Sequence, residues 1–337
     1  MPQRRLCVAP MMGWTDRHCR YFLRQISRHC RLYTEMVTTG ALLQGDPERA
    51  LRFSTAEHPV ALQLGGSDPE ALAQAARIGA GYGYDEINLN LGCPSDRVRS
   101  GRFGACLMAE PQLVGDCMAA MQGAVSLPVS VKLRIGIDDQ DSYEHLARFT
   151  ATLAQAGCRT FIVHARKAIL GGLSPKENRT IPPLQYDMVY RLKRDFPALE
   201  IILNGGIASL DDAARHLGHV DGVMLGRAAY HNPWILAQAE QRFFPTAHPP
   251  AAREQVIERM LPYIETELER GTALKHITRH LLGLYRGVAG AREWRRHLGR
   301  NAAPPGAGTE VVRHALDAVN RIGTCDRYKT ERLSSCG

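Results

Sequence analysis

The residues best suited to chemistry in this sequence stand at or beside the ends of short apolar, β-rich runs. Gln63, Lys132 and His164 are three of them, and glycines follow two later runs. If the runs are parallel strands of a β/α barrel, the loops after their carboxyl ends meet at one rim. Any one polar residue could simply cap its own strand, but the whole series is better explained by a shared pocket. We expect this pocket to bind a cofactor.

The glycines after the last two runs predict a phosphate site. Asn204-Gly-Gly follows the seventh run and Gly226-Arg follows the eighth. Barrels commonly hold a phosphate there, through backbone N–H groups and an arginine, and glycine lets the main chain approach it closely. A lone Gly-Gly could be an ordinary turn, but the two signals in this order favour a phosphorylated ligand.

Lys132, His164 and Gln63 indicate what kind of cofactor the rim binds. A cation beside the pyrimidine edge of a flavin stabilises the anionic reduced form, and the Gln63 amide could bond to the same ring edge. The trio suits a flavin better than a sugar or a metal. No His, Asp and Glu cluster has the spacing of metal ligands, so we predict no metal.

Cys93 stands between Gly92 and Pro94, in a turn that leaves the fourth run. The basic, glycine-containing segment 95–104 follows it and has the character of a lid. A free cysteine is usually a small buried apolar residue, but a position at the rim favours a functional role for this one.

These residues need a scaffold of alternating strands and helices. Eight β-rich runs predict strands over Leu6–Pro10, Arg31–Met36, Val60–Leu64, Glu86–Asn90, Val129–Leu133, Thr160–His164, Glu200–Asn204 and Gly222–Leu225. Apolar spacing of three or four residues predicts helices between them, over Asp16–Ser27, Pro69–Tyr82, Pro111–Val125, Ser142–Ala156, Tyr186–Phe196 and Leu210–Leu217. We expect an α/β fold, a (β/α)8 TIM barrel, with an open doubly wound sheet as the alternative.

A Pro-rich break after residue 243 ends the strand signals. Helical periodicity then predicts a small bundle, with helices over 252–269, 274–288, 292–300 and 310–322. We therefore expect a barrel domain at 1–243, a helical domain at 251–322 and a loose tail at 323–337.

Composition limits the setting and the partners. The net charge is +8, and from residue 251 onward 15 Lys and Arg face 10 Asp and Glu, which suggests an anionic partner such as nucleic acid. Nine cysteines without a C-x-x-C pair are typical of a reducing compartment. The sequence shows no signal-peptide core and no apolar run of about 18 residues. We expect a cytoplasmic protein with no membrane partner, a monomer or a weak dimer.

The same segments resemble the tRNA-dihydrouridine synthases, subfamily A, over nearly the whole chain to about residue 320. The resemblance lies in residues 8–21, 33–40, 59–67, 85–97, 164–168, 172–179, 204–207, 226–227 and 277–284, among them Asp85-Glu-Ile-Asn-Leu-Asn-Leu-Gly-Cys-Pro. Gly13 departs from the pattern, because an acidic residue is expected there, and residues 324–337 match nothing familiar.

The resemblance implies reduction of uridine at positions 20 and 20a of the tRNA D-loop, with tightly bound FMN and with NADPH as reductant. It implies Cys93 as proton donor. It implies FMN binding by Pro10, Met11, Met12, Gln63, Lys132, His164, Asn204, Gly205, Gly206, Gly226 and Arg227. It also implies tRNA contacts from Asn90, Lys176, Arg179, Arg292 and Arg295.

This reaction adds a hydride to carbon 6 of uracil and a proton to carbon 5. Reduced FMN can deliver the hydride, and a free cysteine with a pKa of about 8.5 is mostly a neutral thiol that can give the proton. The nearby cations Arg97, Arg99 and Lys132 would favour the thiolate. We nevertheless expect Cys93 to stay protonated.

The target base must leave its stack, and contacts to the RNA backbone must offset that cost. Between residues 275 and 300 the chain has seven Lys and Arg but one acid, and Arg292, Arg295 and Arg296 share a helix face. An ordinary solvated surface is the alternative for this stretch.

Two other functions fit parts of the sequence. An FMN barrel acting on a free pyrimidine, as dihydroorotate dehydrogenases do, would have a similar rim but no need of the basic helices. A tRNA-binding chaperone with a vestigial barrel would be colourless, because it would carry no flavin.

Overall fold

The computed structural model describes residues 4–244 and 252–334, which form two compact units. One consists of residues 1–17 and 29–226, and the other of residues 18–28 and 227–337. The sequence placed the boundary near residue 243 instead, and the Pro-rich segment 245–251 itself lies outside the described residues.

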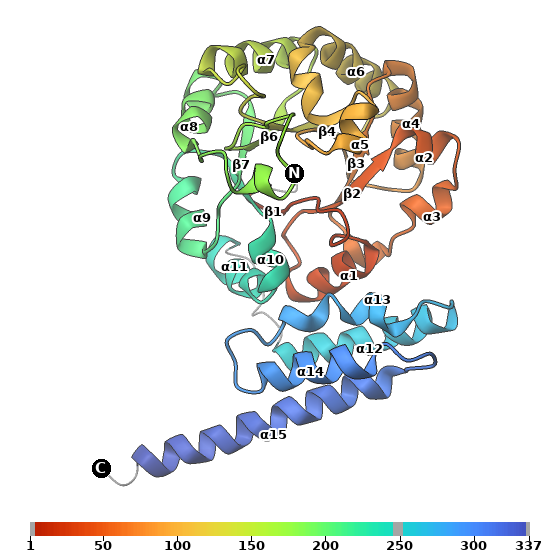
Figure 1. Cartoon of the computed structure of the whole chain (residues 1–337), viewed down its shortest axis with the longest axis vertical. Helices are drawn as coiled ribbons and strands as arrows, with labels where there is room; N and C mark the ends of the chain where they lie inside the picture. Colours follow the sequence, from red (N-terminus) through yellow and green to blue (C-terminus); the bar gives the residue numbers. More distant parts are fainter. Residues whose placement is uncertain (1–3, 245–251, 335–337) are drawn as a thin grey trace. The chain divides into compact units, whose positions relative to one another are not determined.

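The first unit is a barrel of eight parallel strands in the order β1-β8-β7-β6-β5-β4-β3-β2 (Figure 1). The strands are β1 (Leu6–Val8), β2 (Leu32–Thr38), β3 (Val60–Gly65), β4 (Glu86–Leu91), β5 (Val129–Arg134), β6 (Thr160–His164), β7 (Glu200–Asn204) and β8 (Gly222–Leu225). The barrel closes between β1 and β2, where the Val8 N–H donates to the Arg31 carbonyl (2.9 Å) and the Arg31 N–H to the Leu6 carbonyl (3.0 Å). All eight predicted strands are confirmed, and the open-sheet alternative is wrong.

Helices separate most of the strands, as the apolar spacing predicted. The helices of this unit are α2 (Thr39–Leu43), α3 (Pro47–Leu51), α4 (Pro69–Gly81), α5 (Asp96–Ser100), α6 (Pro111–Ala124), α7 (Tyr143–Gln155), α8 (Tyr186–Asp195) and α9 (Leu210–Leu217), with 3-10 turns η1 (Thr55–Glu57), η2 (Gly104–Ala109) and η3 (Glu177–Arg179). Local chemistry sets several starts: the Asp68 carboxylate accepts from the Ala71 N–H at 2.7 Å and Pro69 fills the first turn of α4.

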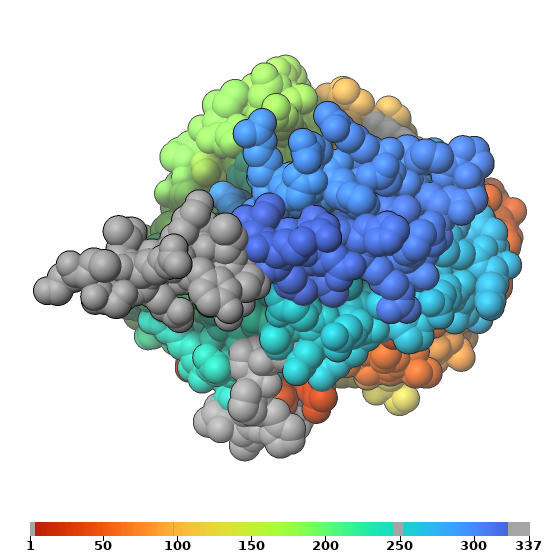
Figure 2. Space-filling model, turned by 90° about the horizontal axis from the view of Figure 1, so that it is seen from below, coloured from red at the N-terminus to blue at the C-terminus, as the bar shows by residue number. Residues whose placement is uncertain are grey.

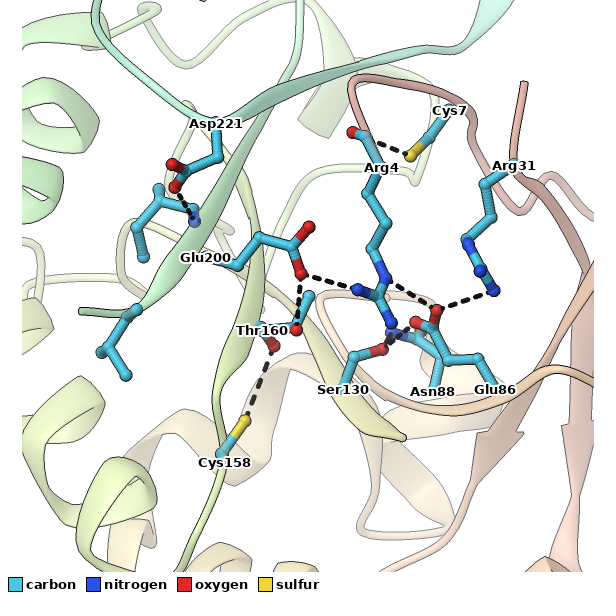
Figure 3. Close-up of polar contacts among 12 residues, drawn as sticks. Arg4, Cys7, Arg31, Glu86, Asn88, Ser130, Cys158, Thr160, Glu200 and Asp221 are labelled. Atoms are coloured by element: carbon cyan, nitrogen blue, oxygen red, sulfur yellow. Dashed lines mark hydrogen bonds and ion pairs between the residues drawn. The ribbon is translucent and has the colours of Figure 1, made fainter. Parts of the chain in front are cut away.

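Buried ion pairs occupy the amino-terminal end of the barrel (Figure 3). Arg4 donates to Glu86 at 2.8 Å and to Glu200 at 2.7 Å, and Arg31 lies 3.1 Å from Glu86. Above them part of the interior is apolar and includes Ile162, Ile202 and Met224, while buried polar side chains of β3, β4 and β5 occupy another part. The carboxyl-terminal rim is therefore left as the place for a ligand.

The second unit is helical, with α1 (Arg17–Ile26), α10 (Arg227–His231), α11 (Ile235–Phe243), α12 (Arg253–Glu269), α13 (Leu274–Thr278), η4 (Leu281–Gly283), α14 (Ala291–Asn301) and α15 (Thr309–Ser334). Residues of α1 belong here because they pack on α12: the Tyr21 ring stacks on Tyr263 at 3.8 Å between centroids, and His18 Nδ1 lies 2.8 Å from the Tyr263 hydroxyl. No helix in the described part of the chain is long and apolar enough to cross a membrane.

The helices of this unit differ from the expectations at two places. Instead of a single helix over 274–288 the structure has α13, which ends at Thr278, and the short η4; Gly287, beyond both, has a φ of +78° that no α-helix contains. The tail expected to be loose from residue 323 instead continues α15 to Ser334, since nothing after Gly323 in that stretch is glycine or proline. Residues 335–337 of that tail lie outside the described residues.

Candidate active site

Four neighbouring strands bring the predicted polar residues to one rim. The strand register pairs Asn90 with Lys132 and His164 with Asn204. The Lys132 ammonium donates to Asn204 Oδ1 at 3.0 Å, and the Asn204 amide donates to the Met224 carbonyl at 2.8 Å. Side chains from β5 and β7 are thereby joined to β8 across the mouth of the barrel.

The electrostatics of this rim are dominated by positive charge. Burial, and then the positive charge of Arg134, lower the pKa of Lys132 to about 7, although the thiol of Cys93 acts in the opposite direction. Burial and the cations Arg134, Lys132, Arg166 and Arg179 hold the pKa of His164 well below its usual range, so this imidazole is neutral at pH 7. Buried cations gathered at one rim in a low-dielectric setting favour an anionic ligand.

The turn after β7 approaches its neighbours too closely for any residue but glycine. Gly205 and Gly206 have φ values of +109° and +71°. A methyl group on Gly205 would lie 2.5 Å from the His164 ring, and one on Gly206 would lie 2.5 Å from the Tyr186 hydroxyl. Tyr186 also donates to the Gly205 carbonyl at 3.0 Å, so the shape of the turn is fixed by its own neighbours.

The loop after β1 contributes Pro10, Met11 and Met12 to the same end of the barrel. Met11 packs partly against the barrel interior, and Met12 is 65% exposed. Gly13, where the family pattern led us to expect an acidic residue, has a φ of +75° and donates its N–H to the carboxylate of Glu35 in the middle of β2. The conformation of this loop therefore favours glycine, and β2 supplies a carboxylate to the loop.

Gly226 differs from the other two glycines. A methyl group there would lie 3.8 Å from Met11 Sδ, an ordinary van der Waals distance, and its φ is not positive. The protein alone does not require glycine at this position. Arg227 follows it directly and is exposed at the start of α10.

Cys93 is half-buried in a tightly held turn two residues beyond β4. Its N–H donates to Asn90 Oδ1 at 3.0 Å, its carbonyl accepts from the Ala105 N–H at 3.0 Å, and its Sγ lies 3.5 Å from Ser95 Oγ. Gly104 has a φ of +75°, and a methyl group there would lie 2.7 Å from the Cys93 carbonyl oxygen. The loop can therefore approach the Cys93 turn this closely only because residue 104 is glycine. The thiol is close enough to influence the pKa values of Lys132 and Arg134, so the candidate acid belongs to the same rim.

Arg134 is a site residue whose role the sequence did not reveal. Its buried guanidinium donates to the carbonyls of Gly92 (2.9 Å), Lys167 (3.0 Å) and Asn178 (2.9 Å). It therefore ties the Cys93 turn to the loop after β6. Arg134 is the last residue of β5, and the carbonyls that it binds lie 33 to 44 residues away in the chain.

The residues of the rim fit FMN. The paired glycines leave backbone N–H groups beside a turn that no side chain can fill, and the cations Lys132 and Arg134 lie next to it in the barrel mouth. A phosphate and an anionic ring are the kinds of group that such donors bind.

The residues predicted to contact tRNA fall into two groups. In the barrel unit, Lys176 and Arg179 are exposed on the loop around η3, whereas Asn90 is buried, with its amide bonded to Gln63 and to the Cys93 turn. In the second unit, Arg292 and Arg295 are exposed on α14 and have no carboxylate partner among the described residues. Figure 2 shows the surface of these C-terminal helices in blue. Each of these contacts with RNA stays a prediction.

Comparisons with known proteins show what this chain is similar to. The chain is 60% identical over 316 residues to a tRNA-dihydrouridine(20/20a) synthase of Vibrio cholerae serotype O1, which covers 94% of this chain and 96% of that protein. The proteins of the same name from Escherichia coli K12 and Yersinia pestis are 60% and 58% identical, over 94% and 95% of this chain and 91% and 92% of theirs.

A solved structure shares the fold. The old yellow enzyme homologue from Zymomonas mobilis is 14% identical, with a TM-score of 0.50, and covers 75% of this chain and 92% of its own. The model of the family described as dihydrouridine synthase (Dus) matches residues 7–320. This chain is therefore a member of the dihydrouridine synthase family.

Proposed function

We propose that this protein reduces uridine to 5,6-dihydrouridine at positions 20 and 20a of the tRNA D-loop, with FMN bound at the barrel rim and NADPH as reductant. The observation that carries the proposal is the rim itself: Cys93 and the cationic, glycine-lined mouth lie together at the carboxyl ends of β4 to β8. The names of the similar proteins agree with it, because each is a tRNA-dihydrouridine(20/20a) synthase.

FMN would be held by the predicted set of residues, from Pro10 to Arg227. The backbone of Gly205, Gly206 and Gly226 and the Arg227 guanidinium would bind its phosphate, and Gln63, Lys132 and His164 would face the ring. When bound and reduced, FMN supplies the hydride for carbon 6 of uracil. A charged Lys132 stabilises negative charge beside it, and the neutral His164 can donate or accept a hydrogen bond.

Cys93 would supply the second hydrogen. The turn after β4 fixes its backbone at both the N–H and the carbonyl, so the thiol is directed without the help of substrate. As hydride adds to carbon 6, carbon 5 becomes enolate-like, and a positioned acid at this point protonates it. The neighbouring Ser95 hydroxyl, 3.5 Å from the sulfur, can then return a proton to the thiolate from solvent.

Binding of tRNA would use the exposed cations of both units, Lys176 and Arg179 on the barrel and Arg292 and Arg295 on α14. We also propose that the protein works in the cytoplasm as a monomer, where its RNA substrate and NADPH are found.

The test uses the purified full-length protein with bound flavin. We expect NADPH-dependent formation of dihydrouridine at positions 20 and 20a in unmodified tRNA, read by primer extension or mass spectrometry. Turnover of free uridine or orotate at a comparable rate would instead favour the free-pyrimidine enzyme, and a colourless protein that binds tRNA would favour the chaperone.

A further inference from the structure

A line of hydrogen-bonded side chains runs along the inside of the barrel, from its amino-terminal end to the turn that carries Cys93. Glu86, Asn88 and Asn90 are the first, third and fifth residues of β4 and therefore point to the same face. The register places Gln63 of β3 and Ser130 of β5 on either side of Asn88. We call Glu86, Ser130, Asn88, Gln63 and Asn90 the amide relay; four of the five are at most 1% exposed, and Asn90 is 8% exposed.

Glu86 fixes the direction of the first bond. One carboxylate oxygen lies 2.8 Å from Arg4 Nε and 3.1 Å from Arg31, and the other accepts from the Ser130 hydroxyl (Figure 3). That second oxygen also accepts from the Tyr33 hydroxyl at 3.2 Å. A carboxylate between two guanidinium groups offers only acceptors. The Ser130 hydroxyl must therefore donate to it.

The donor-to-acceptor direction of this first hydrogen bond sets the direction of the next ones, which join the side-chain amides. Because the Ser130 hydrogen is used, its oxygen accepts from Asn88 Nδ2 at 2.7 Å (Figure 3). The carbonyl of Asn88 must then face Gln63, whose Nε2 donates to it at 2.8 Å. The carbonyl of Gln63 in turn accepts from Asn90 Nδ2 at 2.8 Å.

The other end of the relay demands the same direction. Asn90 Oδ1 accepts from the backbone N–H groups of Gly92 (3.1 Å) and Cys93 (3.0 Å), and a backbone N–H can only donate. The oxygen and nitrogen of a side-chain amide are usually hard to assign, but here a pure acceptor at one end and pure donors at the other allow one orientation of all three amides.

We infer that Glu86, Ser130 and Asn88 are positioning residues of this enzyme, which act through Gln63 and Asn90 to orient the Cys93 turn and the amide that faces the cofactor. None of the three reaches the rim, and the roles given to Cys93 and Gln63 rest on the proposed function. If the relay loses its direction, the Asn90 carbonyl no longer has to face the turn, and the thiol loses its fixed place.

The decisive variant is Ser130→Ala, which removes the link between the carboxylate and the amides. Thr160→Val is its matched control. Thr160 donates to Glu200 at 2.8 Å at the same end of the barrel, and Arg4 joins Glu200 to Glu86, but Thr160 has no bond to an amide of the relay. Both changes remove one buried hydroxyl bonded to a glutamate (Figure 3).

Two readouts are made on the flavin-loaded, full-length protein. The first is the rate of alkylation of Cys93 by iodoacetamide without tRNA, followed by peptide mass spectrometry so that the other cysteines do not interfere. The second is the single-turnover rate of dihydrouridine formation. We expect Ser130→Ala to change the alkylation rate at least threefold and to slow the turnover at least tenfold, while Thr160→Val stays within twofold of the wild-type protein in both.

The inference is overturned if Ser130→Ala melts at the wild-type temperature and also alkylates and turns over as the wild-type protein does, or if Thr160→Val shows the same losses. Should Ser130→Ala fail to fold, Ser130→Cys keeps most of the volume with weaker hydrogen bonds, and the same two readouts decide. Alkylation needs neither tRNA nor catalysis. Suppose that Ser130→Ala changes the alkylation rate of Cys93, while a separate Cys93→Ala variant keeps its activity. The amide relay is then supported, and the proposed role of Cys93 as proton donor fails.

Discussion

At the scale of single residues, Lys132 is a group whose protonation state changes near neutral pH. Its neighbours in the rim include Arg134 rather than a carboxylate, and burial lowers its pKa to about 7. A lysine in this state is protonated below pH 7 and neutral above it. An anionic ligand stabilises the protonated form and so raises this pKa when it binds.

The affinity for reduced FMN should therefore depend on pH. From pH 7 to pH 9 the free protein loses the Lys132 proton, which binding of the anion must restore, so the dissociation constant should rise by up to about tenfold per pH unit. Anaerobic fluorescence titration measures this constant. Lys132→Met should bind more weakly at pH 7 and lose the pH dependence, whereas Cys93→Ala should keep it; a flat profile in the wild-type protein would contradict the assignment.

Gly205 and Gly226 make a second prediction, because the fold requires glycine at the first position and not at the second. Gly205→Ala places a methyl group 2.5 Å from His164 at a φ of +109° and should cost about 1–3 kcal/mol of folding free energy. Gly226→Ala meets no atom closer than 3.8 Å and should fold normally. If a phosphate lies against Gly226, this variant should nevertheless bind FMN at least tenfold more weakly, as equilibrium dialysis would show. Wild-type affinity would remove Gly226 from the site.

At the scale of elements, Arg134 couples two loops that the strands alone would leave independent. It holds Gly92 beside Cys93 and also Lys167 and Asn178 in the loop after β6. Asn178 in turn closes that loop, because its side chain bonds to the backbone of Ile169 at 2.8 and 2.9 Å. The loop that carries Lys176 and Arg179 is thus tied to the Cys93 turn.

We predict that Arg134→Leu loosens both loops together. Three buried carbonyls would lose a charged donor, which should cost about 2–4 kcal/mol of folding free energy, and hydrogen exchange should speed up in residues 92–95 and 167–178 alike. Arg99→Ala is the control, since Arg99 also donates to this loop, at Leu170, but is exposed and should cost about 0–1 kcal/mol. Faster exchange in only one of the two loops would contradict the coupling.

The sequence predicted what depends on local pattern. All eight strands were visible because each is a short apolar run ended by a turn residue, and Lys132, His164 and Asn204 could be placed on one rim from their position at strand ends. The end of α13 at Thr278 and the turn at Gly287 were missed because apolar spacing continues through them. Neither the role of Arg134 nor the amide relay could be predicted, since their partners come from other strands and depend on the register of the closed barrel.

At the scale of the whole molecule, the feature that bears on RNA binding is the exposed positive charge of the second unit. The second unit exposes Lys275, Arg279, Arg286, Arg292 and Arg295, while Arg296 pairs with Glu293 at 2.6 Å. The shared helix face of three arginines expected from the sequence therefore offers two of them to a partner.

We predict that replacing both Arg292 and Arg295 by alanine weakens tRNA binding and flattens its salt dependence by about 0.7–0.9 in the log–log slope for each phosphate that the protein no longer neutralises. The measurement is a titration of labelled tRNA across a salt series. Arg313→Ala, which removes an arginine that lies 3.8 Å from Glu265 in the same unit, should leave the slope nearly unchanged. Equal slopes for the double variant and the wild-type protein would mean that this face is only a solvated surface.

The central claim is that the thiol of Cys93 and a flavin at the same rim together saturate one base of tRNA. It is tested most directly by reducing the flavin of the Cys93→Ala protein without oxygen, adding tRNA, and following dihydrouridine formation and flavin reoxidation in a single turnover. We predict normal tRNA binding and a rate at least a hundredfold below that of the wild-type protein, within the range of effects typical of a lost general acid. A wild-type rate would contradict the claim.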